Sequence, residues 1–158
     1  MFIFRSDECG RVFAYRKNGT RFDRENIQAT HNSGRKTVPV WAWFSADGGG
    51  DFVRIQGRFN SEKYLNILQN VLLPSARQRF PEGPIRFIHD NSSIHRAHVV
   101  RDWFREHPEF DVLPWPPKGA DMNPIENIWG DIVKDMEGYR AQSADEVFER
   151  SLSVWEGY

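Results

Sequence analysis

The order of the predicted strands is the feature that most constrains the fold of this 158-residue chain. Two apolar runs, 38–45 and 51–57, flank Ala46-Asp-Gly-Gly-Gly50, a turn sequence whose glycines tolerate positive φ. These runs predict a β-hairpin. Two further strands, at 2–6 and 11–16, are expected to precede it. The first part of the chain is therefore predicted to consist of strands.

The middle of the chain changes to helical periodicity. Asn60 occupies an N-cap position before apolar residues that recur at helical spacing. Pro74 is expected to disturb or end this helix, because proline lacks the backbone N–H that the helix uses. A short apolar strand at 85–89 follows and is predicted to end at Asp90.

The last part of the chain continues the alternation. A helix with Ala97, Val100 and Phe104 on one stripe should end at His107, because a residue before proline resists helical geometry. A strand at 110–113 comes next. Two further helices are predicted, one starting at Pro124 and one over 144–155. The apolar positions of the helix after Pro124 are Ile125, Ile128, Trp129, Ile132, Val133 and Met136.

Strands followed by strand–helix alternation indicate an α/β fold in one domain, 1–158, with helices packed on a mixed five-stranded sheet. This order matches the ribonuclease-H-like fold, in which the first and fourth main strands are neighbours. The single cysteine, Cys9, excludes an internal disulfide. No membrane segment is predicted, because the longest apolar run, 38–44, is short and contains Pro39. Without a secretory pattern, the nucleus is the expected location, or the cytoplasm for a bacterial protein.

The charge distribution is asymmetric although the net charge is only −1. Residues 1–40 are net basic and residues 120–158 are net acidic. Such asymmetry permits a basic surface facing DNA, and a solvated surface with uneven charge is the alternative. The candidate phosphate-binding residues are Arg16, Lys17, Arg21, Arg24, Arg35, Lys36 and Lys118.

Three carboxylates stand at the ends of separate elements. Asp7 ends the first strand, Asp90 ends the strand at 85–89, and Glu126 lies in the first turn of a helix. Side chains at such positions can meet above a sheet. Mg²⁺ and Mn²⁺ prefer oxygen ligands, and two such ions about 3.5–4 Å apart promote in-line displacement at phosphorus. The combination predicts a site for metal-dependent phosphoryl transfer.

Each acidic residue also has a simpler interpretation. With Asn123 as N-cap and Pro124 at N1, Glu126 is placed to complete a capping box. Asp90 with Asn91 is also typical of a turn that ends a strand, and Asp7 alone carries little information. The metal-site hypothesis rests on the three acids together.

Residues near these acids suggest supporting roles. Asn91 is placed to hydrogen-bond a metal-bound water or a phosphate, or else to cap the turn after the strand. His95 is expected one turn into the next helix, where it would orient a carboxylate or assist proton transfer, unless it is purely structural. Asp121 is expected to fix its loop or to add negative charge before the helix N-terminus, and Trp115 to fill the core rather than to stack on a DNA base.

Three segments resemble motifs of mariner-type transposases and their bacterial insertion-sequence relatives. Phe87-Ile-His-Asp90-Asn91-Ser-Ser-Ile-His95 resembles the second-aspartate motif of that family. Trp115-Pro-Pro117, together with Asp121-Met-Asn-Pro-Ile-Glu126-Asn-Ile-Trp129, resembles the third-acid motif. Ser6-Asp7-Glu8 matches the first. The resemblance covers almost the whole chain.

This resemblance implies a D-D-E catalytic triad of Asp7, Asp90 and Glu126 that holds two Mg²⁺ or Mn²⁺ ions. It further implies DNA strand cleavage and strand transfer, with transposon ends and target DNA as partners, and it allows a homodimer. His95 and Asn91 would then belong to the surroundings of the metal site.

Departures from the family pattern leave two alternatives open. Lys118-Gly-Ala120 stands where the family commonly has Ser-Pro, and the first strand begins directly after Met1. We therefore expect a catalytic domain without its N-terminal DNA-binding modules, with an early C-terminal end. One alternative is a domesticated or truncated remnant that binds DNA or protein without catalysis. The other is a ribonuclease H or another nuclease of the same fold.

Overall fold

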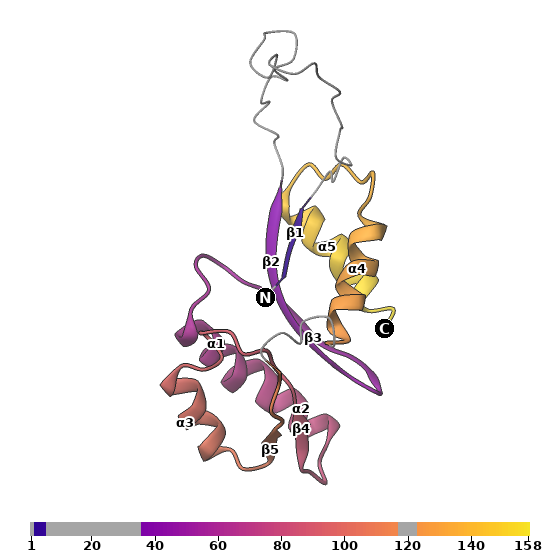
Figure 1. The fold of residues 1–158 in the computed structure, drawn as a ribbon. Coiled ribbons are helices and arrows are strands. Elements are labelled where there is room, and N and C mark those ends of the chain that lie inside the picture. Colours follow the sequence, from indigo (N-terminus) through magenta and orange to yellow (C-terminus); the bar gives the residue numbers. More distant parts are fainter. Residues whose placement is uncertain (1, 6–35, 117–122) are drawn as a thin grey trace, which may run out of the picture.

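The computed structural model describes residues 2–5, 36–116 and 123–158. Its described strands form two separate sheets (Figure 1). The first sheet is antiparallel, in the order β1-β2-β3, and contains β1 (Phe2–Arg5), β2 (Thr37–Ser45) and β3 (Gly48–Arg54). The second is a parallel pair, β4 (Ile85–Phe87) with β5 (Phe110–Val112).

The predicted α/β content is confirmed, but the predicted five-stranded sheet is not present among the described residues. β1 pairs only with β2 there, and no hydrogen-bonded ladder joins β1 to β4. β4 is also shorter than predicted, ending at Phe87 rather than at His89. The predicted strand at 11–16 lies outside the described residues.

β2 is the central strand of the first sheet, and both of its faces are covered. Trp41 and Trp43 point into one hydrophobic cluster, whereas Val38, Val40 and Ala42 point into another. Successive side chains of a strand alternate between faces, so one strand supplies both clusters. Figure 1 shows α4 and α5 beside one side of this sheet, with α1, α2 and α3 gathered near β4 and β5 on the other.

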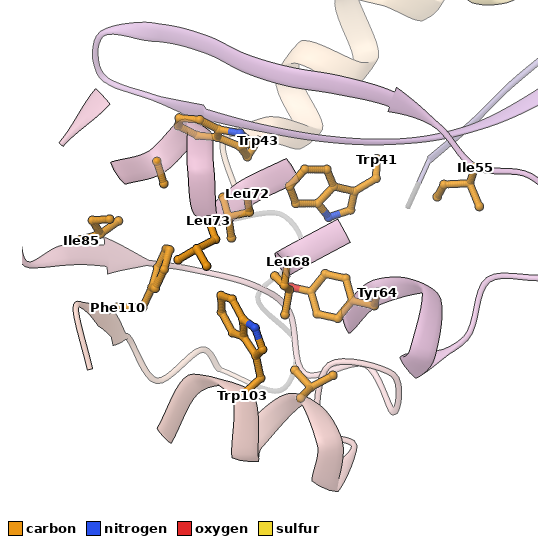
Figure 2. Packing of buried hydrophobic residues seen from close by; sticks show 12 residues of the cluster. Trp41, Trp43, Ile55, Tyr64, Leu68, Leu72, Leu73, Ile85, Trp103 and Phe110 are labelled. Carbon is orange, nitrogen blue, oxygen red and sulfur yellow. The ribbon is translucent and has the colours of Figure 1, made fainter. Parts of the chain in front are cut away.

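The first cluster joins β2 to the helical part of the chain (Figure 2). Tyr64, Leu68 and Leu72 are almost fully buried there. Further buried members include Ile55, Leu73, Ala76, Ile85, Val100, Trp103 and Phe110. The second cluster packs α4 and α5 against the other face and includes Phe52, Ile128, Trp129, Ile132, Met136, Val147 and Trp155. Two cores on one strand fix the sheet between the helices.

The predicted hairpin is present, but the glycines belong to the strand rather than to the turn. The turn consists of Ala46 and Asp47, and β3 begins at Gly48. The β2–β3 register shifts so that Trp43 faces two residues of β3, including Gly50. A Cβ atom built on Gly50 would lie 2.2 Å from the Trp43 ring. Glycine is therefore required at position 50 because the Trp43 ring packs there. The sequence pattern of a turn does not reveal this requirement.

The helix after Asn60 does not end at Pro74, but it is disturbed there as predicted, because a π-helical segment directly precedes the proline. α1 (Ser61–Ile67) leads into a π-helical segment, η2 (Leu68–Leu72), and then into α2 (Leu73–Arg79). The wider π turn moves the missing N–H of Pro74 to a place where the helix tolerates it. Asn60 caps α1 as predicted, its Oδ1 accepting a hydrogen bond from the Lys63 N–H at 3.0 Å.

The remaining helices match the sequence pattern closely. α3 (His98–Glu106) ends before His107, α4 covers Ile125–Asp135, and α5 covers Ala144–Trp155. The side chain of Ser143 caps α5 through the Glu146 N–H at 3.1 Å. None of the described helices is both long enough and apolar enough to span a membrane.

Candidate active site

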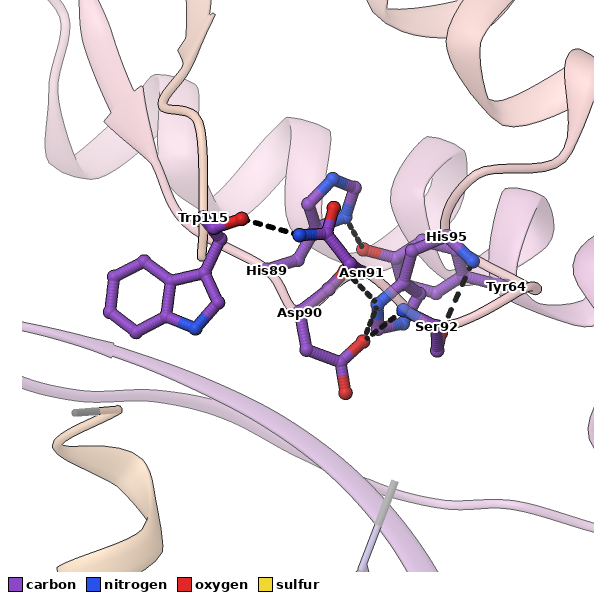
Figure 3. Close-up of polar contacts among 7 residues, drawn as sticks. All are labelled: Tyr64, His89, Asp90, Asn91, Ser92, His95 and Trp115. Carbon is purple, nitrogen blue, oxygen red and sulfur yellow. Dashed lines mark hydrogen bonds and ion pairs between the residues drawn. The ribbon is translucent and has the colours of Figure 1, made fainter. Parts of the chain in front are cut away.

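Asp90 lies in the loop between β4 and α3, three residues after the observed end of the strand. Its Oδ1 accepts a hydrogen bond from the Ser92 N–H at 2.9 Å and lies 2.7 Å from His95 Nδ1 (Figure 3). The Asp90 side chain remains 56% exposed, whereas the His95 side chain is only 11% exposed. The carboxylate is thus held on one side and open to a ligand on the other.

His95 is the main side-chain partner of Asp90. Its Nδ1 lies 3.2 Å from the Asp90 carbonyl oxygen as well as close to the carboxylate. Both neighbours are acceptors, so Nδ1 carries the proton and donates. His95 was predicted inside a helix, but it lies in the turn before α3, where its N–H donates to Ser92 Oγ at 3.3 Å. The predicted contact with the acid is nevertheless present.

Tyr64 and His89 lie behind His95, and neither was assigned a role from the sequence. The Tyr64 hydroxyl is 3.0 Å from His89 Nδ1. The His89 and His95 rings are stacked, with centroids 4.9 Å apart and planes 8° apart. Tyr64 sits at an apolar position of α1, so the sequence pattern marks it only as a core residue. Its polar partner becomes visible only in three dimensions.

Burial determines the protonation states of Tyr64, His89 and His95. It lowers the pKa of His89 to about 4, with a further lowering by the neighbouring His95. Burial also lowers the pKa of His95, although Asp90 opposes that change. The pKa of Tyr64 is raised, again mainly by burial. Tyr64 therefore stays protonated and donates to a neutral His89.

The same contacts keep Asp90 ionised. Partial burial alone would raise the pKa of its carboxyl group, but hydrogen bonds from Ser92 and the influence of His95 outweigh that and lower the pKa. Hydrogen bonds to the charged form of an acid favour ionisation. An anionic, partly exposed carboxylate is the form that binds a cation.

Asn91 points away from Asp90 toward the segment after β5. Its Nδ2 donates to the carbonyl oxygen of Trp115, which is half-buried. This contact ties the Asp90 loop to the segment that follows β5. Asn91 therefore has a structural partner beside any role toward a bound ligand.

Glu126 lies in the first turn of α4 and is exposed. The helix starts at Ile125 with Pro124 at the N-cap position, one residue later than predicted. Asn123 Oδ1 accepts from the Ile125 N–H at 3.4 Å. Within the described part of the chain, the Glu126 carboxylate makes no hydrogen bond or ion pair, so the capping box that was the alternative interpretation is not formed there.

Asp90 and Glu126 line the same cavity, which has a volume of about 730 Å³. The cavity is bordered by residues 41–46 from β2 and the adjoining turn, by residues 84–90 around β4, and by residues 123–126 at the start of α4. His95 also lines it. Two of the three predicted acids are thus brought to one cavity, although they lie far apart in the sequence.

Several predicted residues lie outside the described residues: Asp7, Asp121, Arg16, Lys17, Arg21, Arg24, Arg35 and Lys118. Lys36 precedes β2 and is half-buried. Among the described residues, no three His, Cys, Asp or Glu side chains form a group that could hold a metal ion. Asp90 and Glu126 are two of the three expected ligands, and their exposed carboxylates are the hard oxygen donors that Mg²⁺ and Mn²⁺ prefer.

Comparison with known proteins shows the family to which this chain belongs. A family described as "DDE superfamily endonuclease" matches residues 2–147. The Tcb2 transposase of Caenorhabditis briggsae is 32% identical over 87% of this chain and 50% of its own length. The Tc1 transposase of Caenorhabditis elegans is 31% identical over 97% of this chain and 55% of its own length. The chain spans about half the length of these curated relatives.

Solved structures share the fold at lower identity. The catalytic domain of the Mos1 mariner transposase superposes with a TM-score of 0.70 at 21% identity, covering 78% of this chain and 63% of that one. The Mos1 mariner paired end complex with Mn gives a TM-score of 0.74 at 20% identity, covering 99% of this chain and 47% of that one. The fold is therefore that of a ribonuclease-H-like transposase catalytic domain. With the match over residues 2–147, the chain belongs to the DDE superfamily endonucleases.

Proposed function

We propose that this chain is the catalytic domain of a DNA transposase, which cleaves and joins DNA strands with two Mg²⁺ or Mn²⁺ ions held by Asp7, Asp90 and Glu126. The observation that carries this proposal is the shared cavity of Asp90 and Glu126 in a member of the DDE endonucleases. A triad that includes Asp7 extends the proposal to a residue outside the described part of the chain.

The side chains at the cavity have separate tasks in this proposal. Asp90 supplies an anionic oxygen held in place by Ser92 and His95. Glu126 supplies a second carboxylate from the rigid first turn of α4. Two divalent ions bound there would activate a water or a 3′-hydroxyl and stabilise the leaving oxygen. His95 keeps the Asp90 carboxylate oriented, as groups behind a metal ligand commonly do.

We also propose that β1 lies between β2 and β4 in the active protein, which completes the five-stranded sheet. The cavity supports this arrangement because it is bordered by consecutive residues, 41–46 on one side and 84–90 on the other. A cavity against one face of a strand would contact alternate residues, whereas one along an edge contacts all of them. β1 now pairs with residues 37–40 and would have to shift along β2.

This sheet arrangement has a direct test. Nuclear Overhauser effects between the amides of β1 and β4 should appear in the Mg²⁺-loaded protein. If β1 amides contact only β2 at saturating Mg²⁺, the joined sheet is wrong.

DNA is the proposed partner, both as transposon ends and as target. The Mos1 structures include a paired-end complex with the left transposon end, a pre-cleavage transpososome and a strand transfer complex, all by their own descriptions. The basic residues between Arg16 and Lys36, with Lys118, are proposed to contact phosphates. A homodimer and a location in the nucleus, or in the cytoplasm for a bacterial protein, complete the proposal.

The test of the proposed function is metal-dependent cleavage of duplex DNA. Asp90→Asn and Glu126→Gln should each abolish cleavage, because each removes an anionic ligand while keeping the side-chain shape. Asp102→Asn and Glu137→Gln make the same chemical changes at exposed positions away from the cavity and should leave cleavage intact. Cleavage that survives both site changes would refute the proposal.

The choice of substrate separates the alternatives. A ribonuclease H would cut the RNA strand of a hybrid and leave duplex DNA intact. A non-catalytic remnant would cut neither and would take up no Mn²⁺.

A further inference from the structure

We propose that Tyr64 and His89 are positioning residues for Asp90, acting through His95, and that they leave Asp90 Oδ2 as the oxygen that faces the divalent ion. This inference rests on the proposed function, in which Asp90 is a metal ligand.

The three rings form a compact group behind the acid (Figure 3). Tyr64 is only 1% exposed, and its hydroxyl reaches His89 Nδ1 at 3.0 Å. The Tyr64 and His95 ring centroids are 4.3 Å apart, and the His89 ring stacks on His95 with planes 8° apart. His95 is thus in ring contact with both partners, and they are tied to each other by a hydrogen bond.

These contacts determine where the His95 ring nitrogen lies. With the ring held on two sides, Nδ1 stays 2.7 Å from Asp90 Oδ1 and donates to the Asp90 carbonyl oxygen at 3.2 Å. The Ser92 N–H donates to the same oxygen. Asp90 Oδ1 therefore has the Ser92 N–H as donor and the His95 ring nitrogen as a close neighbour, whereas Oδ2 has no hydrogen-bond or ion-pair partner among the described residues. Figure 3 shows Oδ2 pointing away from the histidines.

The Tyr64 hydroxyl is not needed to fill the core. A phenylalanine would occupy almost the same volume, and burying a hydroxyl is unfavourable unless it is hydrogen-bonded. The hydroxyl adds one thing, the bond that fixes the His89 ring against His95. Its removal should therefore disturb the orientation of Asp90 more than the packing of the cluster.

The first experiment measures Mn²⁺ affinity by calorimetry for the wild type, Tyr64→Phe and Tyr139→Phe. Tyr139 is a half-buried tyrosine packed against the second hydrophobic cluster, the one that contains α4 and α5. Its variant is therefore a matched control for loss of a hydroxyl. We expect Tyr64→Phe to weaken Mn²⁺ binding about threefold to tenfold, at the lower end of the effects of outer groups on metal ligands. The control should bind as the wild type does. Equal affinities in all three proteins would overturn the inference.

A double-mutant cycle with His95→Asn tests the route through His95. Asparagine keeps a donor near Asp90 but lacks the ring that Tyr64 and His89 hold. If Tyr64 acts through His95, Tyr64→Phe should produce no further loss of Mn²⁺ affinity in the His95→Asn protein. An equal loss in both backgrounds would show that Tyr64 acts by another path and would contradict the inference.

Hydrogen exchange in the metal-free protein gives a readout that does not depend on metal binding. The Ser92 N–H donates to Asp90 Oδ1, so its exchange reports whether that carboxylate is held. We expect exchange about fivefold faster in Tyr64→Phe, the effect of weakening one ordinary hydrogen bond. The Glu146 N–H, bonded to Ser143 Oγ at the start of α5 and away from the site, should not change and serves as the matched control.

The two readouts separate the failure of this inference from failure of the proposed function. Absence of Mn²⁺ binding in the wild type would remove the proposed metal site, while the Ser92 amide would still show whether Tyr64 holds Asp90. Unchanged Ser92 exchange in Tyr64→Phe would overturn the positioning role whatever the metal data show.

Discussion

At the scale of single residues, a close approach between Gly50 and Trp43 shapes the β2–β3 hairpin. The tryptophan ring lies where a side chain at position 50 would begin, and its Nε1 donates to Asp51 Oδ2 at 2.8 Å. The sequence pattern places Gly50 in a turn because glycines commonly serve turns. Packing of an indole ring on the neighbouring strand leaves no mark in the spacing of apolar and turn residues.

Gly50→Ala should destabilise the protein by about 1–3 kcal/mol, the usual cost of forcing extra atoms into a packed core. Chemical denaturation measures this change. Gly130→Ala is the matched control, because Gly130 lies inside α4 and an added Cβ would meet no atom within 4 Å beyond its chain neighbours and the adjacent helix backbone. It should instead stabilise the protein by about 0.5–1 kcal/mol. A neutral Gly50→Ala would mean that the Trp43 ring is not packed on that glycine.

His89 should make stability depend on pH below neutrality. Its pKa is about 4 in the folded protein against an ordinary 6.5, so above pH 6.5 it is neutral in both states. Between those values the unfolded chain binds a proton that the folded protein does not. The free energy of unfolding therefore decreases as the pH is lowered through this range. The loss levels off below about pH 4, where both states are protonated.

The expected size of this effect is about 2 kcal/mol between pH 7 and pH 5, measured by urea unfolding of the metal-free protein. His89→Asn keeps a polar atom near Tyr64 but has no such titration, so its stability should fall less over the same range. An identical pH dependence in both proteins would show that His89 is not the group responsible.

At the scale of elements, the helices were largely predictable from the sequence and the strands less so. Helix caps and apolar spacing are local signals, and they located α5 and the start of α1 correctly. Pro74 was expected to disturb or end its helix; the disturbance is present as the π-helical segment Leu68–Leu72, but the helix continues through the proline. Tyr64 and His89 belong to different parts of the chain. The contact between them could not be predicted from the local sequence of either.

The Asn60 cap gives a test at this scale. Asn60→Ala should lower the free energy of unfolding by about 1 kcal/mol, because the Lys63 N–H at the start of α1 loses its acceptor. Asn60→Asp should retain nearly all stability, since aspartate caps as well as asparagine does. Thermal and chemical unfolding of both variants measure these changes. An equal loss of stability in Asn60→Ala and Asn60→Asp would contradict the capping role of Asn60.

At the scale of the whole molecule, Asp90 and Glu126 share a cavity, as the sequence motifs predicted. The five-stranded sheet expected around them is not formed by the described strands. Asp90 follows a strand and Glu126 lies in a helix, both of which the sequence located to within a few residues. Pairing between β1 and β4 depends on contacts between distant segments and on the surroundings of Asp7, which pattern alone does not fix.

DNA binding by this chain should be weak and strongly dependent on salt. The proposed contacts are Lys and Arg side chains with phosphates, and such contacts release counterions. The logarithm of the binding constant should fall linearly with the logarithm of salt concentration, as measured by fluorescence anisotropy with a labelled duplex. Tight binding to one sequence that persists at high salt would contradict this expectation.

The most direct test of the central claim is Mn²⁺ binding measured by calorimetry on the wild type, Asp90→Ala and Glu126→Ala. The account predicts binding by the wild type that is lost or greatly weakened in both variants, while Asp102→Ala, an exposed change on α3, binds normally. Equal Mn²⁺ binding by the wild type and both site variants, or none by the folded wild type, would contradict a divalent-metal site built on Asp90 and Glu126.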